Sequence, residues 1–457
     1  MINENSLILP YLLLLFLVLP YLNRVSSVFD YIEPNVKFGL HDGTFLLLAH
    51  LFKGFFILIL FEFIAGHHFI WGALFSIITF LITILFEKFI RYSISVHLNN
   101  PNHTGLTFFK DRTGNYAFYV ILTTMGLIAF VALMAEITWT TLLIPQVFNL
   151  SQKWVLISLL FLLYVYAVVG GLEAIGKVSR VLIFFIFFTI VCLLLYVYLT
   201  NGIYSIYHNW TQQKSINQSR LFSKNQEPYM WFLMIPVIFG YLLTNLSLWH
   251  IRFCMKENRV KTIYTSAAFC WASLMITLMM IAVYAQTTGW DIPSFVSQIP
   301  QEMPHSSTFF ISLLVMVVIS ISLVSSMVGV KSIMDTFLLF IIKNEKVDRS
   351  FLKRLYISSL GPVMLLFAIL RPTTALLYTC VRIFTALCVV SVPTFLLFVI
   401  SREKVTMVKV LPLFIGILAC LFFFNSPLSP LFSLYLSLLF SLSLQFIIWI
   451  CQIILHK

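Results

Sequence analysis

The chain has few charged residues and no long polar segment. Only 10% of its 457 residues are charged and 60% are hydrophobic, and the mean hydropathy is +0.97. Soluble domains contain roughly 25% charged residues, so this composition excludes a soluble protein and predicts a polytopic protein of the lipid bilayer. Basic cytoplasmic loops explain the excess of 29 basic over 17 acidic residues, and we expect no nucleic-acid partner.

The motifs of catalytic and metal sites are also missing from the sequence. Its seven cysteines lie in or beside apolar segments without a C-x-x-C pair. The sequence has no H-E-x-x-H, no G-x-S-x-G and no helix with paired carboxylates. We therefore expect that the chain is not an enzyme and that it holds no metal ion other than sodium.

Apolar stretches long enough to cross a bilayer recur along the whole chain. A crossing helix needs about 20 apolar residues, which predicts about 13 transmembrane helices. The first is interpreted as a retained helix because no basic residue precedes it, as one would in a signal peptide. The predicted crossings centre near residues 7–22, 44–64, 69–87, 116–143, 153–172, 178–199, 229–251, 262–286, 308–342, 352–370, 373–400, 408–425 and 430–455.

The charges of the loops predict the orientation of the chain. Loops after odd-numbered crossings carry most of the Lys and Arg residues, from Lys88 and Arg91 to Arg402 and Lys404. The other loops are mostly short, polar or acidic, with 200–228 as the exception. Basic loops stay in the cytoplasm, so we expect an external N-terminus, a cytoplasmic C-terminus and a location in the plasma membrane.

One predicted crossing carries a cluster of hydroxyl groups. In residues 307–340, Ser322, Ser325 and Ser326 stand at i, i+3 and i+4 and share one helical face. Small residues also ease helix packing in membranes. A clustered face, however, offers the hard oxygen ligands that a small cation prefers. Lys331 and Asp335 follow at i and i+4, a spacing at which they can pair.

Five short motifs together resemble the solute:sodium symporter family. Residues 166–174, YAVVGGLEA, are similar to its Y-x-x-x-G-G-L-x-A signature, and residues 107–114 to the segment before its third core helix. Residues 252–256, RFCMK, resemble the exit of the sixth core helix. Residues 323–326, LVSS, and 390–393, VSVP, resemble parts of the eighth and tenth. The resemblance extends over about residues 40–405.

This resemblance implies the LeuT-type fold: ten core helices in two inverted five-helix repeats, with one leading and two trailing helices. Residues 1–43 would form the leading helix and a cytoplasmic loop, and 44–199 the first repeat. An external loop at 200–228 would precede the second repeat at 229–405, and 406–457 would hold the trailing helices.

In such folds the solute binds at the midplane, where the first helix of each repeat is interrupted. We expect these interruptions near Lys53 and Gly54 and within residues 240–247, GYLLTNLS. Glycine relaxes a helix there, and Tyr241, Thr244 and Asn245 supply hydrogen-bonding groups. These three residues are predicted to bind the solute.

The same resemblance implies a sodium site on the eighth core helix. Its ligands would be the Ser322 carbonyl and the Ser325 and Ser326 hydroxyls. Main-chain carbonyls of the first core helix, placed at Gly54 and Ile57, would complete it.

The chain departs from the family at two places. Where the family has T-D-V-x-Q after the G-G-L-x-A motif, residues 178–181 read VSRV, so the carboxylate is absent and Arg180 is adjacent. The first core helix is expected to be rich in small residues, but residues 55–61 read FFILILF.

Lys53 falls near the expected sodium carbonyls and allows three interpretations. Glu62 lies about 13 Å away along the helix axis at 1.5 Å per residue, so the two pair poorly. Lys53 can be a structural cation, a neighbour that weakens the sodium site, or a group whose protonation replaces sodium binding.

Two further charges are expected inside the membrane. Glu136 lies in the external half of its helix, and Arg382 lies about 15 Å below the external end of its own. Intramembrane charges are candidates for function. Arg382 can attract an anionic solute or pair with Glu136, and Glu136 can act as a ligand or gate.

The sequence predicts a secondary active transporter that imports a small organic solute with sodium. The alternatives are a proton-coupled or uncoupled transporter that uses Lys53 in place of the ion, and a transporter-like solute sensor or regulatory subunit that has lost coupling.

Overall fold

The computed structural model describes residues 31, 37–57, 60, 69–97, 105–148, 151–169, 171–212, 227–287, 308–341, 372–400 and 404–424, and residues 439, 442–443 and 446–447. The predicted crossings at 7–22 and 352–370 lie outside these residues, as does most of the one at 430–455.

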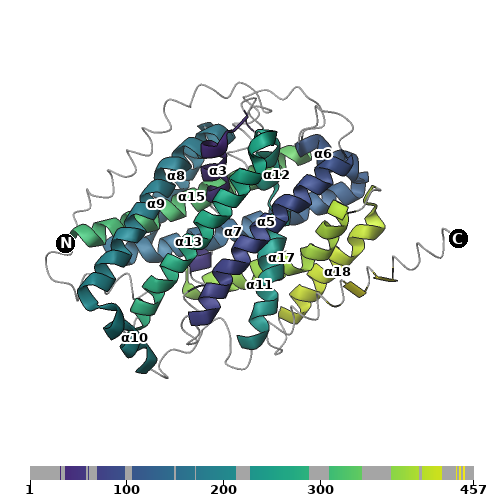
Figure 1. Ribbon diagram of the computed structural model, residues 1–457. Coiled ribbons are helices and arrows are strands. Elements are labelled where there is room, and N and C mark those ends of the chain that lie inside the picture. The colour runs from purple at the N-terminus through teal and green to yellow at the C-terminus, as the bar shows by residue number, and fades with distance from the viewer. Residues whose placement is uncertain are drawn as a thin grey trace.

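The described chain is helical almost throughout (Figure 1). Its first half contains α3 (Leu40–Leu51), α5 (Phe69–His97), α6 (Gly105–Arg112), α7 (Asn115–Phe148), α8 (Gln152–Val169), α9 (Gly171–Asn201) and α10 (Ile203–Gln212). Its second half contains α11 (Glu227–Thr244), α12 (Leu246–Phe253), the 3₁₀ turn η3 (Glu257–Arg259), α13 (Val260–Thr287), α15 (Thr308–Ile341), α17 (Thr374–Ile400) and α18 (Met407–Phe424).

Several of these helices are long and apolar enough to cross a membrane. Among the described residues there are 5 such helices, or up to 6 if the bent pair α11–α12 is one span. An all-helical polytopic membrane protein is therefore confirmed. The total of about 13 crossings, which rests on apolar length, stays a prediction.

The first core helix is interrupted where the sequence predicts. Helix α3 ends at Leu51, Phe52 is extended with ψ 118°, and helical conformation resumes at Gly54. A break frees main-chain carbonyls, which need new partners inside a membrane. Here the carbonyl of His50 accepts a hydrogen bond from the Tyr241 hydroxyl of α11.

The second interruption is also confirmed. Helices α11 and α12 meet at Asn245 with a bend of 59°. Gly240 stands one turn before the bend, and a Cβ there would collide with the carbonyl of Cys388 on α17. Only glycine allows this close approach of the two backbones.

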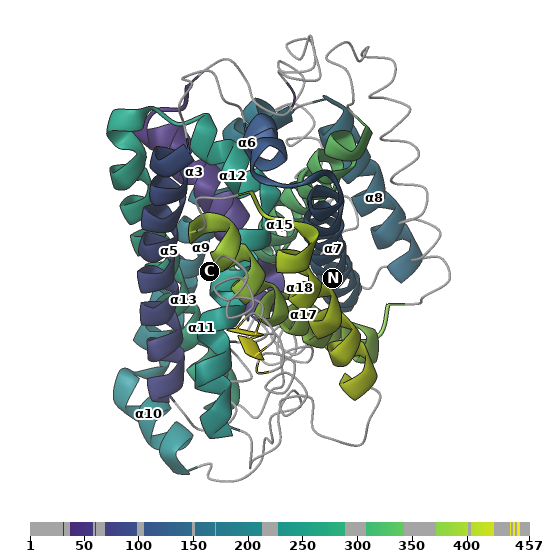
Figure 2. The same cartoon turned by 90° about the vertical axis from the view of Figure 1, so that its right-hand side faces the viewer.

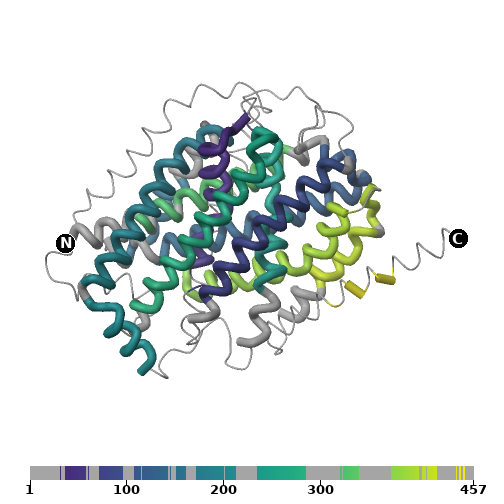
Figure 3. The backbone as a smooth tube through the Cα atoms, viewed as in Figure 1, coloured from purple at the N-terminus to yellow at the C-terminus, as the bar shows by residue number. Residues whose placement is uncertain are grey.

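Matching helices of the two predicted repeats pack against each other. Helix α5 lies along α13, and α7 lies along α15 (Figure 3). If the chain divides at 200–228, these are the second and third core helices of the first repeat against the seventh and eighth of the second. The packing agrees with an inverted repeat, while the predicted repeat boundaries stay predictions.

The G-G motif joins two helices differently from the prediction. The predicted crossings at 153–172 and 178–199 leave a short loop that contains Lys177, but α9 already begins at Gly171. Gly171 has φ +53° and lies against the backbone of Tyr31, a combination that only glycine tolerates. Lys177 pairs with Glu173 on the first turns of α9, so the basic residues belong to the helix.

Two segments predicted as loops also contain helices. Helix α5 continues to His97 and is followed by α6, so residues 88–115 are largely helical. Helix α10 lies within the predicted loop 200–228. The ribbons place α6 and α12 at one end of the bundle and α10 at the other, in both views (Figures 1 and 2).

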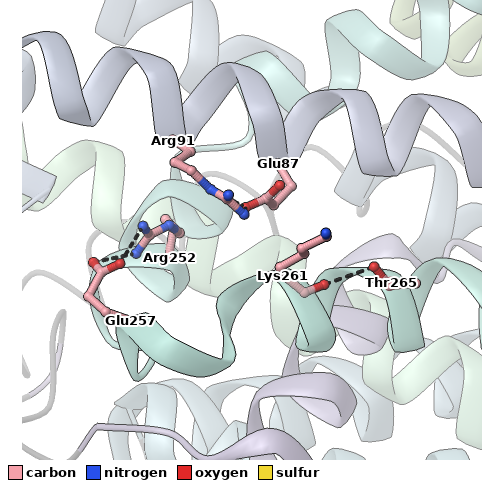
Figure 4. A network of polar contacts seen from close by, with 6 residues as sticks. All are labelled: Glu87, Arg91, Arg252, Glu257, Lys261 and Thr265. Atoms are coloured by element: carbon pink, nitrogen blue, oxygen red, sulfur yellow. Dashed lines mark hydrogen bonds and ion pairs between the residues drawn. The ribbon is translucent and has the colours of Figure 1, made fainter.

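A polar network closes the end of the bundle that holds α12. The Arg252 guanidinium donates to both carboxylate oxygens of Glu257, at 3.0 Å each. Arg91 pairs with Glu87 on α5, beside Arg252 (Figure 4). Nearby, the exposed Lys37 donates to the Phe253 carbonyl at 2.5 Å.

Candidate solute and cation site

The two helix interruptions are joined directly by side chains. Asn245, at the bend between α11 and α12, donates from Nδ2 to the Tyr241 hydroxyl at 3.0 Å. The Tyr241 hydroxyl in turn donates to the carbonyl of His50 beside the first break. Two of the predicted solute-binding residues, Tyr241 and Asn245, therefore lie at the crossing of the two broken helices.

Thr244 plays a local part at this crossing. Its hydroxyl donates to the carbonyl of Gly240 at 2.7 Å, within its own helix, and the side chain is buried. A threonine that bonds back to its helix satisfies itself without a ligand. Its predicted contact with a solute stays a prediction.

Aromatic rings surround the crossing. Phe55, directly after the first break, packs edge-on against Phe384 of α17 with ring centres 4.9 Å apart. Phe56 lies 6.0 Å from both Tyr241 and Trp271, measured between ring centres. The bulky side chains of the first core helix thus face the predicted solute position.

The hydroxyl pair on α15 is buried inside the protein. Ser325 and Ser326 are both 0% exposed, and neither hydroxyl has a hydrogen-bond partner. The two serines therefore face the interior of the protein and not the lipid. Ser322 lies on the same helix, and its side chain is outside the part that the structure describes.

Lys53 reaches this hydroxyl pair. Its side chain is 2% exposed, and Nζ lies 3.4 Å from the main-chain carbonyl of Ser325. The ammonium group also lies 6.0 Å from the ring centre of Tyr241. This contact agrees with two of the three interpretations from the sequence. In one, Lys53 is a neighbour that weakens the sodium site; in the other, its protonation replaces sodium binding.

Glu136 faces the same position from α7. Lys53 and Glu136 interact electrostatically, although their charged atoms are not within ion-pair distance. A Cβ on Gly54 would lie 2.8 Å from Oε2 of Glu136, so the carboxylate rests against the first break. The Ser325 hydroxyl faces the carboxylate, but neither carboxylate oxygen has a partner in hydrogen-bond geometry.

The pairing of Glu136 with Arg382, one of our two expectations, is wrong. The two residues form no ion pair, and the electrostatic partner of Glu136 is Lys53. Arg382 is half-buried on α17, and its Nε has no hydrogen-bond partner. The error arose because depth along a helix does not determine which neighbour its face meets.

A second buried ion pair lies further along α15. Lys331 pairs with Asp335, as their spacing predicted, and the two side chains are 1% and 0% exposed. Asp335 also accepts a hydrogen bond from Ser247 of α12 at 3.0 Å. Ser332 contacts both Ser247 and the Asn245 side chain. This pair therefore holds the bend between α11 and α12 against α15.

Sequence reasoning missed the link between Lys53 and Glu136. The two residues are far apart in the chain. Glu136 was considered as a partner of Arg382, and Lys53 was given no partner. Their shared feature, an unpaired charge within an apolar segment, was visible. The packing of α7 against the first break leaves no trace in the sequence.

The fold is the LeuT-type fold. The chain is similar to a Na⁺-coupled sialic acid symporter, solved in a substrate-bound outward-open state, with a TM-score of 0.72 and 13% identity over 97% of this chain and 96% of that one. It is also similar to an Eremococcus coleocola manganese transporter, with a TM-score of 0.58 and 15% identity over 92% and 97% of the two chains.

A third similar structure is that of a nucleobase-cation-symport-1 family transporter, with a TM-score of 0.54 and 13% identity over 93% and 94% of the two chains. No protein-family model matches the sequence, and a comparison with curated proteins finds no significant match. The class that fold and site define is thus a membrane protein with the architecture of secondary transporters.

Proposed function

We propose that this chain is a secondary active transporter that imports a small organic solute. The observation that carries the proposal is the meeting of two interrupted helices at a buried polar centre, where Tyr241 bonds to the carbonyl of His50. Interrupted helices at the middle of a bundle are where such transporters bind solute. The similar structures that bind or carry small solutes support the same function.

The solute that we propose carries a carboxylate group. Arg382 stands on α17, the helix whose Phe384 packs on Tyr241 at the crossing. Its guanidinium Nε lacks a hydrogen-bond partner, and guanidinium groups bind carboxylates well. Tyr241 and Asn245 are proposed to complete the binding site for this carboxylate. Glu136, an anion itself, is proposed to contact another part of the solute.

The coupling ion has two candidates. Ser325 and Ser326, with the Ser322, Gly54 and Ile57 carbonyls, are the ligands proposed for sodium. The contact of the Lys53 ammonium group with the Ser325 carbonyl favours the alternative, in which the lysine takes the position of the ion.

Uptake by purified protein in liposomes tests transport. Radiolabelled organic acids, amino acids and sugars are offered with an inward gradient of sodium, of protons, or of neither. A transporter accumulates one of them above its external concentration. A solute that binds but never accumulates would instead indicate a solute sensor, the second candidate function. The aromatic packing around Phe55 and Phe56 is the observation that supports this alternative.

A further inference from the structure

The polar groups around Lys53 are buried without the partners that buried polar groups normally have. The Glu136 carboxylate faces the Ser325 hydroxyl and the main-chain N–H groups of Gly54 and Phe55, but neither of its oxygens, nor the hydroxyls of Ser325 and Ser326, has a partner in hydrogen-bond geometry. The Lys53 ammonium group makes one long hydrogen bond, to a carbonyl. Buried polar groups are usually satisfied, and a cluster of exceptions is typical of a functional site. The three elements that contribute these groups are the first break, α7 and α15.

The charge of this cluster argues against a sodium ion. Glu136 is the acidic group that interacts with Lys53, so the two charges already balance. A sodium ion on the Ser325 and Ser326 hydroxyls would add a second cation next to the ammonium group. At low dielectric, two cations sharing a single carboxylate repel each other strongly.

We propose that Lys53 and Glu136 form a proton-binding site in which the Lys53 ammonium group replaces the coupling sodium ion. With its proton bound, Lys53 connects the first break to the Ser325 carbonyl of α15. When the proton leaves, the N–H bond breaks, its electron pair stays on Nζ, and water accepts the proton. The neutral amine is a weaker donor, so the first core helix is then held less tightly to α15.

The proton-binding site has further titratable neighbours. On α3, the buried His50 interacts electrostatically with both Lys53 and Lys331, and its Nε2 has no hydrogen-bond partner. From α15, Lys331 is neutralised by Asp335. From α11, the ring of Tyr241 faces Lys53. With Lys331 and Asp335 paired, Lys53 and Glu136 are the two members of this group whose charges are not held in a close ion pair.

The proposal takes its purpose from the proposed transport function, but its test needs no solute. Protein reconstituted on a solid-supported membrane receives a sudden change of pH or of sodium concentration, and the displaced charge is recorded. The wild-type chain should give a transient current after the pH jump and none after the sodium jump. In Lys53→Met, Glu136 loses its counter-ion beside the Ser325 and Ser326 hydroxyls, so a current should follow the sodium jump and none should follow the pH jump.

Two further variants complete the test. Glu136→Gln should abolish the pH response and also fail to respond to sodium. Lys177→Met removes a lysine that is paired with Glu173 away from the site, and it should behave as the wild type. A sodium-dependent current in the wild-type chain would overturn the proposal, and so would a pH response that persists in Glu136→Gln. Because the wild-type sodium jump needs no variant, the proposal is decided even if Lys53→Met does not fold.

Discussion

The hydroxyl of Tyr241 donates to the carbonyl of His50, and this one bond joins the interruptions of both broken helices. In a membrane interior the freed carbonyl has no water to accept from. Tyr241→Phe should therefore cost about 1 kcal/mol of stability and abolish solute accumulation, because the two breaks are no longer held in register. Thermal unfolding and liposome uptake measure the two effects.

Tyr198→Phe is the matched control. Tyr198 also donates to a main-chain carbonyl, that of Met280, at 3.1 Å, but it joins α9 to α13 away from the breaks. It should show a similar stability cost without loss of accumulation. Equal loss of uptake in both variants would contradict a specific role for Tyr241.

The close approach of α11 to α17 gives a second prediction. A methyl group on Gly240 would overlap the Cys388 carbonyl, which is backbone and cannot rotate away. Gly240→Ala should destabilise the protein by about 1–3 kcal/mol. Gly176→Ala, where the nearest atom would be 3.7 Å away in a Leu46 side chain, should be close to neutral. Melting temperatures of the two variants in the same detergent give the comparison.

The buried pair of Lys331 and Asp335 should be far more costly to break than a half-exposed pair with the same spacing. Asp335→Asn leaves an uncompensated ammonium group at 1% exposure, at a cost of about 3–5 kcal/mol. Glu173→Gln breaks the pair with Lys177, whose members are 26% and 31% exposed, and should cost about 0–1 kcal/mol. Similar losses in both variants would show that the Asp335 site is accessible to water.

Much of this architecture was predictable because its signals are local. Gly240, Tyr241 and Asn245 interrupt an apolar run with groups that a continuous helix does not need, and the bend lies there. Lys331 and Asp335 are one helical turn apart, so their pairing required no knowledge of the fold. Ser325 and Ser326 belong to one helix as well, so their hydroxyls marked the inner face of α15 without knowledge of the fold.

What failed depended on how separate helices face each other. Arg382 was offered as a partner of Glu136 from depth alone, while the packing of α7 brings Glu136 to Lys53 and Gly54. The start of α9 was placed too late because basic residues were taken to mark a turn. In the structure α9 begins at Gly171, which has a positive φ, and the basic residues lie inside the helix.

The predicted orientation can be tested at two exposed positions on opposite ends of the bundle. Tyr204, 81% exposed on α10, should lie outside, and Lys256, exposed between α12 and η3, should lie in the cytoplasm. Basic residues gather at the end that holds Lys256, including Arg252 and Arg259, and such loops remain cytoplasmic.

In a chain with its native cysteines replaced, a membrane-impermeant thiol reagent applied to intact cells should label Tyr204→Cys and spare Lys256→Cys. After permeabilisation both should react. Labelling of Lys256→Cys alone in intact cells would contradict the predicted orientation and place the N-terminus in the cytoplasm.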